Sequence, residues 1–273
     1  MIVTGTLIAA TLSGIAIGIL SGLLGIGGGV VMVPLFRLGF GLTAIEATAT
    51  SLFAIIPTGI SGAAAHIRNR TSQPAVGVAA GLGGALTSPA GVALATMSPG
   101  WAIMLAAALV IGYSAYNMLK KALKMPREAR PARPEQEKAA PAIAPTGHAT
   151  RKQLVVGFSI GLLAGVISGY VGVGGGFIMI PLFIAYAGIS MKQASGTSLI
   201  AVAILALPGA VSQLMYGNVH LAIGLAVAVG SIPGAMLGAN LAKRVPERSL
   251  RLLFGAMLLA AAAIMAANEF FLP

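Results

Sequence analysis

The sequence predicts an all-α polytopic membrane protein made of two repeats of inverted topology. Three observations support this prediction. Hydrophobic residues make up 57% of the 273-residue chain and charged residues only 8%, whereas soluble domains carry about 25% charged residues. The apolar residues gather in stretches long enough to cross a bilayer, and one motif occurs in both halves of the chain. Each repeat is expected to hold a helical hairpin broken by glycines and three further transmembrane helices.

The apolar stretches predict where the helices lie. Eight long helices are expected at 3–26, 43–66, 74–97, 100–121, 153–173, 191–216, 219–242 and 249–271. Two shorter stretches, 28–40 and 175–188, each follow three consecutive glycines. A helix of about 14 residues covers only about 21 Å of a hydrocarbon core about 30 Å thick. The short segments are therefore expected to be tilted or to cross in part.

The composition changes between residues 122 and 151. This segment contains five prolines, many charges and no large apolar cluster, so it cannot bury a core and is expected to be a flexible linker. It separates a first transmembrane repeat, 1–121, from a second, 152–273. The N-terminus has no basic residue before its apolar run, which favours a membrane helix over a cleaved signal peptide.

The two repeats align without a gap when 147 is added to each residue number. "GIGGGVVMVPLF" begins at Gly25 and "GVGGGFIMIPLF" begins at Gly172. Between residues 14 and 52, 17 of 39 positions are identical to their counterparts. Internal repeats of this size are typical of secondary transporters.

The distribution of basic residues predicts that the repeats are inverted. The loop after the second segment reads "HIRNR" at 66–70 in the first repeat and "YGNVH" at 216–220 in the second, and the next loop reads "MSPGW" at 97–101 and "KRVPERSLR" at 243–251. Lys and Arg collect on the cytoplasmic side, so matching loops should lie on opposite sides. Each repeat then needs an odd number of crossings, which the broken hairpins supply.

This topology predicts a cytoplasmic linker and both chain ends outside, in the inner or plasma membrane of the cell. Only Arg37 among the basic residues would then lie outside. Because the basic residues lie between apolar segments, the formal charge of +11 reflects orientation and not nucleic-acid binding.

The glycine triplets are the first candidate binding site. Three glycines in a row favour a break in a helix, and a break at membrane depth frees backbone groups that protein, water or a ligand must satisfy. A helix that starts there offers unpaired N–H groups and a partial positive charge. The predicted ligands of a small anion are the backbone N–H groups of Gly27, Gly28, Gly29, Gly174, Gly175 and Gly176. Close packing alone is the alternative, and it is the role expected for Gly14, Gly18 and Gly22.

Side chains near the triplets provide further candidates. Repeated hydroxyls could bind the anion or could bond to the preceding helical turn; they belong to Thr50, Ser51, Thr197 and Ser198. Glu46 is a candidate for proton coupling, although it could instead pair with Arg37. His66 is expected at the membrane interface.

The duplicated glycine phrase, the Thr-Ser-Leu at 50–52 and 197–199 and the basic central linker resemble the TauE/SafE sulfite exporter family of permeases. The resemblance covers the chain apart from the linker. It implies transport of sulfur-containing organic or inorganic anions, such as sulfite and sulfonates.

The predicted function is therefore secondary transport of a small oxyanion, sulfite or an organosulfonate, by alternating access. The partners are this anion and the lipid bilayer, with no nucleic acid, cofactor or metal; homo-oligomerisation is left open. A passive anion channel is the first alternative. A membrane-embedded enzyme is the second, and it lacks a metal-ligand cluster and a Ser/His/Asp set at matching depth. No nucleotide-binding loop is present.

Overall fold

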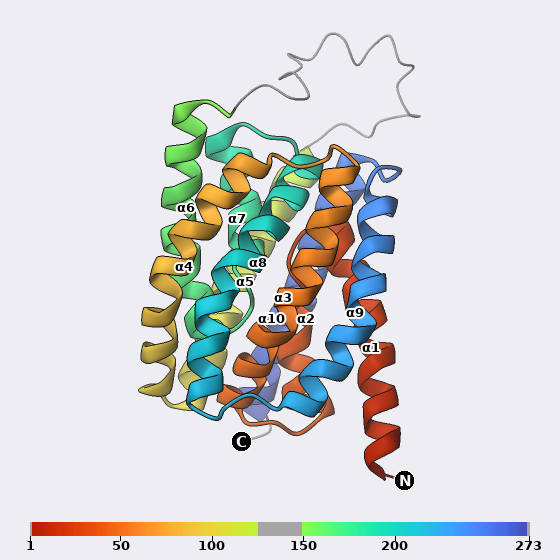
Figure 1. The fold of residues 1–273 in the computed structure, drawn as a ribbon, viewed down its shortest axis with the longest axis vertical. Coiled ribbons are helices and arrows are strands. Elements are labelled where there is room, and N and C mark those ends of the chain that lie inside the picture. The colour runs from red at the N-terminus through yellow and green to blue at the C-terminus, as the bar shows by residue number, and fades with distance from the viewer. Residues whose placement is uncertain (1, 125–148, 272–273) are drawn as a thin grey trace.

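The computed structural model describes residues 2–124 and 149–271, and every regular secondary-structure element within them is a helix (Figure 1). Eight helices are long and apolar enough to cross a membrane. They are α1 (Ile2–Leu24), α3 (Ala44–Arg68), α4 (Pro74–Thr96), α5 (Gly100–Lys124), α6 (Arg151–Val171), α8 (Met191–Met215), α9 (Leu221–Ala242) and α10 (Glu247–Phe271). They confirm the eight expected helices. α5 continues into the segment expected to be linker, and residues 125–148 of that segment lie outside the described residues.

Two short helices follow the glycine triplets, as expected. α2 (Gly29–Pro34) continues into the π-helical turn η1 (Leu35–Gly39), and α7 (Gly176–Leu182) continues into η3 (Phe183–Ala187). Pro34 and Pro181 cannot donate a backbone hydrogen bond to the preceding turn, and a wider turn begins within two residues of each. The chain turns back at the glycine break between α1 and α2, and a short loop, 40–43, then joins η1 to α3.

Successive long helices run in opposite directions, except that α1 and α3 run the same way, and so do α6 and α8, because the short helices α2 and α7 lie between them (Figure 1). α5 ends and α6 begins at one end of the molecule, drawn at the top, which also holds the loops 69–73 and 243–246. α1 begins and α10 ends at the opposite end, together with the loop 216–220. The matching loops 69–73 and 216–220 therefore lie at opposite ends.

The end drawn at the top is called the basic end below. All the described Lys and Arg residues except Arg37 lie in the helix ends and loops there: Arg68, Arg70, Lys120, Lys121, Lys124, Arg151, Lys152, Lys192, Lys243, Arg244, Arg248 and Arg251. Arg37 lies in η1, which runs toward the other end. The described part of the chain thus has a strong charge asymmetry between its two ends.

Helices of the two halves pack against each other in a reciprocal manner. α1 packs on α9 and α6 packs on α4, while α3 packs on α8 and α5 on α10. Glycines allow the closest approaches: a Cβ at Gly18 would lie 2.4 Å from the carbonyl oxygen of Ser231, and a Cβ at Gly165 would lie 2.3 Å from that of Gly84. The packing role expected for the spaced glycines is confirmed, because a side chain would collide with backbone there.

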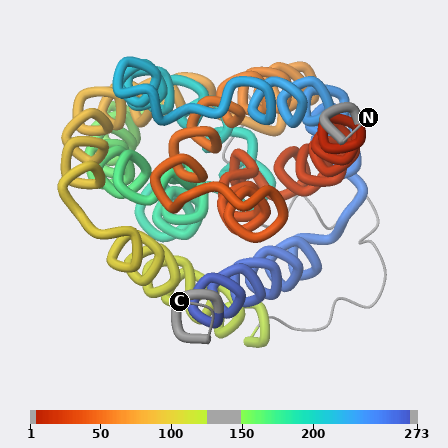
Figure 2. Tube along the Cα trace, turned by 90° about the horizontal axis from the view of Figure 1, so that it is seen from below, coloured from red at the N-terminus to blue at the C-terminus, as the bar shows by residue number. Residues whose placement is uncertain are grey.

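The short helices occupy the interior of the molecule. Seen from below, α5 and α10 form a layer along one side, and α2 and α7 lie between this layer and α3 and α8 (Figure 2). α2 contacts α3 and α10, and α7 contacts α8 and α5. Phe177, Phe183 and Phe254 are fully buried around α7. The two glycine breaks are consequently enclosed on all sides by helices.

Candidate functional site

The two glycine breaks are buried and touch each other. A Cβ at Gly29 would lie 2.4 Å from the carbonyl oxygen of Val173, and a Cβ at Gly176 would lie 2.8 Å from that of Gly25. Gly27 and Gly174 both approach the side chains of Ile55 and Val202, which are themselves 147 positions apart. The six glycines singled out from the sequence therefore lie together in the centre of the fold.

Glycine is required at the point where each short helix begins. Gly28, at φ 89°, and Gly175, at φ 68°, are the N-cap residues of α2 and α7, and neither has a side-chain cap. This left-handed region is readily adopted by glycine and costs other residues energy. A substitution at either position would strain the break even where space is available.

Each break leaves backbone donors without partners. The N–H groups of Val31 and Met32 donate to the carbonyl of Gly28, and those of Ile178 and Met179 donate to that of Gly175. Gly176 donates to the carbonyl of Gly174 over 2.9 Å. Within the described residues no acceptor meets the N–H groups of Gly27, Gly28, Gly29, Gly174 and Gly175. A buried donor left unpaired costs about 1–3 kcal/mol, so these groups favour a bound acceptor.

The serines of the Thr-Ser-Leu motifs face the breaks. The Ser198 hydroxyl can donate to the carbonyl of Gly25, 2.6 Å away, or to that of Ser195, 2.9 Å away. Ser51 is the counterpart of Ser198, and its hydroxyl is buried without a partner in the described part of the chain. It lies one helical turn from Thr48, whose Cα would be 2.5 Å from a Cβ at Gly172. Each serine thus comes from one repeat and borders the break of the other.

The threonines of the same motifs have a different environment. The Thr50 hydroxyl accepts the backbone N–H of His220 over 2.9 Å, and the Thr197 hydroxyl accepts that of Gln73 over 2.9 Å. His220 and Gln73 are the residues that precede α9 and α4. These hydroxyls therefore fix the starts of two neighbouring helices, a role that the motif alone does not indicate.

Two further serines were not selected from the sequence. Ser21 and Ser168 lie one turn before the breaks, and their carbonyls accept the N–H groups of Gly25 and Gly172 over 2.7 Å and 2.8 Å. Both hydroxyls are buried and have no partner among the described residues. A Cβ at Gly175 would lie 3.5 Å from the Cβ of Ser168. The sequence signal was the Ser-Gly pair repeated at 21–22 and 168–169.

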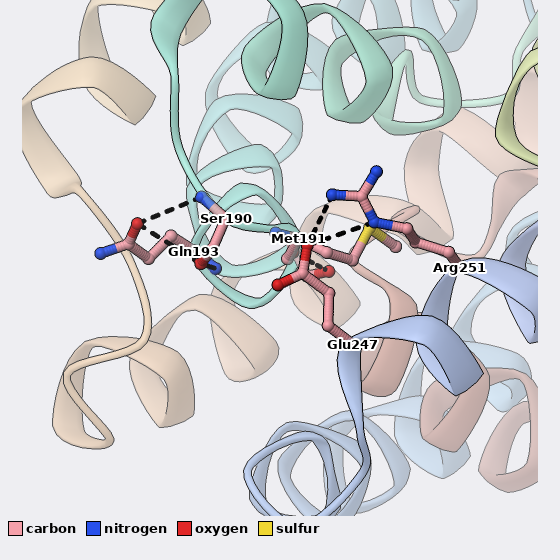
Figure 3. A network of polar contacts seen from close by, with 6 residues as sticks. Ser190, Met191, Gln193, Glu247 and Arg251 are labelled. Atoms are coloured by element: carbon pink, nitrogen blue, oxygen red, sulfur yellow. Dashed lines mark hydrogen bonds and ion pairs between the residues drawn. The ribbon is translucent and has the colours of Figure 1, made fainter. Parts of the chain in front are cut away.

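Glu46 and Glu247 lie at helix starts and not at the breaks. Glu46 is half-buried, and its Oε2 accepts from the backbone N–H and the hydroxyl of Thr43 over 2.9 Å and 2.8 Å, which completes a capping box. Glu247 pairs with Arg251 and accepts the backbone N–H of Met191 over 3.3 Å, joining α10 to α8 (Figure 3). Among the described residues no group of His, Cys, Asp or Glu could hold a metal ion.

Eight spans with paired broken helices in two related halves define a membrane transporter architecture. The family model of the sulfite exporter TauE/SafE matches residues 10–265, and the chain belongs to this family. A probable membrane transporter protein of Bacillus subtilis, YdhB, is 27% identical over 86% of this chain and 90% of its own length. A second from that organism, YunE, is 26% identical over 87% and 89%. A probable membrane transporter protein of Xylella fastidiosa is 26% identical over 94% of both chains. No solved structure matches the chain.

Proposed function

We propose that the protein is a secondary transporter that carries a small oxyanion, sulfite or an organosulfonate, by alternating access. The observation that carries the proposal is the contact between two buried helix breaks, each with backbone N–H groups that have no acceptor among the described residues. The sulfur chemistry rests on the family, whose model is that of a sulfite exporter.

The proposed site holds the anion by hydrogen bonds from both repeats. The N–H groups of Gly27–Gly29 and of Gly174–Gly175 donate to its oxygens, and hydrogen bonds to a charged acceptor are stronger than those to a neutral one. Ser198 donates to the carbonyl of Gly25 and holds the first break in position. Hydroxyls that have no partner among the described residues supply further donors: Ser21, Ser51 and Ser168. Thr50 and Thr197 do not contact the anion but hold the starts of α9 and α4 in position. Ile55 and Val202 flank the glycines and limit the size of the anion.

The two repeats are proposed to be inverted, with the basic end in the cytoplasm and both chain ends outside. The opposite positions of matching loops and the reciprocal packing of α1 on α9 and α6 on α4 support this arrangement. The excess of Lys and Arg at one end supports the orientation. Rocking one repeat against the other would expose the site between them to each side in turn.

The orientation is tested by thiol labelling, because the chain contains no cysteine. Arg244→Cys in the loop 243–246 should react with an impermeant reagent only after the cells are opened. Tyr216→Cys, in the loop at the opposite end, should react in intact cells. The reverse pattern would reject the proposed orientation.

Counterflow in proteoliposomes tests the function itself. Vesicles loaded with unlabelled sulfite should transiently accumulate radiolabelled sulfite above its external concentration, because an alternating-access site exchanges one anion for another. Ethanesulfonate inside the vesicles should replace sulfite if sulfonates share the site. A passive channel would let the label equilibrate without an overshoot. No sulfite- or sulfonate-dependent flux at all would reject the proposed substrates.

A further inference from the structure

His66 is the one buried ionisable side chain among the described residues. It was expected at the membrane interface, but its exposed fraction is 0%. It lies in the last turn of α3, at the basic end, and none of the interactions proposed above for the anion uses it. A buried ionisable group within a membrane helix is costly to maintain and commonly serves in transport.

Both ring nitrogens of His66 have partners. Nε2 lies 2.8 Å from the carbonyl oxygen of Gly22 in α1, and Nδ1 lies 2.7 Å from the hydroxyl of Thr71. A carbonyl can only accept, so Nε2 carries a proton and Nδ1 is the nitrogen that gains or loses one. In the neutral ring Thr71 donates to Nδ1. In the cation Nδ1 donates to Thr71, whose own proton can turn to the backbone carbonyl of His66, 3.3 Å away. The pocket therefore satisfies both protonation states.

Gly196 in α8 leaves room for the side chain of His66 and the backbone of Thr71. A Cβ at Gly196 would lie 2.8 Å from the Cβ of His66 and 2.4 Å from the carbonyl oxygen of Thr71. The corresponding residue in the first repeat is Ala49. Only one of the two equivalent helices is thus built to receive an imidazole ring.

The second repeat places a neutral pair at the equivalent position. Counting 147 residues from His66 and Thr71 leads to Gln213 and Asn218, and the Asn218 amide donates to Gln213 Oε1 over 2.8 Å. Gln213 is also fully buried. The anion-binding breaks are duplicated, but the group that can take up a proton is present in one repeat only.

The charged residues of the elements that pack on His66 are cationic, and the Glu247 carboxylate, at the start of α10 beside α8, is already paired with Arg251. α1 and α4 contain no ionisable residue, α8 and α9 contribute Lys192 and Lys243, and the end of α3 and its loop contribute Arg68 and Arg70. A proton on His66 would therefore lack a negative partner unless an anion is bound. Gly28, which caps α2, follows Gly22 by six residues, or about 9 Å at a rise of about 1.5 Å per residue, so the ring is on the order of 10 Å from the donors of the break.

We propose that His66 is the coupling site, which binds one proton when the oxyanion occupies the glycine breaks, so that the two cross the membrane together. This inference rests on the proposed function. Linkage makes the effect reciprocal: protonation of His66 strengthens anion binding by the factor by which the anion strengthens protonation. Opposite charges about 10 Å apart at an effective dielectric constant of about 20 give a factor on the order of ten. Glu46, which caps α3, is the rival coupling residue.

The test compares sulfite dissociation constants of variants between about pH 5.5 and 8.5, where histidine titrates. His66→Gln removes the proton site, and His66→Gln with Thr71→Asn installs the pair that the second repeat already holds. Protonation of sulfite itself is the same in every sample, so the ratio of variant to wild-type Kd isolates the protein. The ratio should rise from about one at high pH to about ten at low pH in both His66 variants and stay constant in Glu46→Gln. A ratio independent of pH in the His66 variants, or a pH-dependent ratio in Glu46→Gln alone, overturns the proposal.

A second measurement leaves His66 intact. The chain contains three histidines, so His148→Gln with His220→Gln leaves His66 as the only imidazole signal in a magnetic resonance titration. Sulfite should move its titration midpoint upward by about one pH unit, and an unchanged midpoint contradicts the coupling. If the wild-type protein binds neither sulfite nor ethanesulfonate, the anion site itself is rejected. If it binds sulfite and the midpoint stays fixed, only the role of His66 is rejected.

Discussion

Gly18 and Gly28 lie ten residues apart in the first hairpin, and the same residue type serves a different purpose at each. Gly18 sits within α1, where a Cβ would lie 2.4 Å from the Ser231 carbonyl oxygen and 2.8 Å from the Ser231 Cα. Gly28 sits at the break, at φ 89°, and its nearest neighbours are the flexible ends of Ile17 and Met32. Gly18 is needed because a side chain would collide with α9, and Gly28 is needed because its backbone adopts a left-handed conformation. Substitution of Gly18 should therefore lower stability, whereas substitution of Gly28 should lower anion affinity.

The largest effect is expected at the packing glycine. Gly18→Val drives a branched side chain into the backbone of α9, and overpacking of this kind costs about 1–3 kcal/mol or more. Thermal stability in detergent should fall sharply, while the folded fraction binds sulfite with near-normal affinity. Gly165→Val is the matched variant in the second repeat and should behave alike. Normal thermal stability in either variant would show that these glycines are not required for helix packing.

The next effect in size is expected at the breaks. Gly28→Val and Gly175→Val restrict the backbone that presents the N–H groups, and the loss of a hydrogen bond to a charged group costs about 1.5–3 kcal/mol. Sulfite affinity should fall roughly ten- to hundred-fold. The comparison with Gly18 is sharpened by recording melting temperature and affinity on the same purified samples. If these variants melt early but bind sulfite with normal affinity, the triplet glycines also serve helix packing and do not form the anion site.

The smallest effect is expected at the serines beside the breaks. Ser168→Ala removes a buried hydroxyl that has no partner among the described residues, so the melting temperature without ligand should stay level or rise. Sulfite affinity should fall about three- to ten-fold if that hydroxyl donates to the anion. Ser212→Ala is the control, because its hydroxyl already donates to the Pro208 carbonyl over 2.9 Å. Equal affinities in the two variants would remove Ser168 from the site.

Much of the fold follows from local sequence features. The eight long apolar runs and the glycine-triplet breaks place every described helix to within about three residues of its observed ends. The reason is physical: a helix in lipid must satisfy its own backbone and needs about 20 apolar residues. The packing role of Gly18 could also be predicted, because small residues four apart mark a helix contact.

The site could be predicted only in part, because long-range contacts decide it. The repeated phrase identified the glycines, but nothing local indicates that Thr50 and Thr197 accept N–H groups from residues 170 and 124 positions away. The burial of His66 depends on Gly196 and Gly22, which come from two other helices. A Ser-Gly pair such as 21–22 resembles ordinary helix packing until its hydroxyl is seen to lack a partner in the described structure.

The central claim is that two breaks form one anion site, and the stoichiometry of binding tests it most directly. Isothermal titration of sulfite into the purified wild-type protein should give one anion per chain. Gly28→Val alone and Gly175→Val alone should each abolish or greatly weaken that single event, since both breaks contribute donors to the same anion. Two anions per chain, one lost in each variant while the other remains at full affinity, would contradict the shared site.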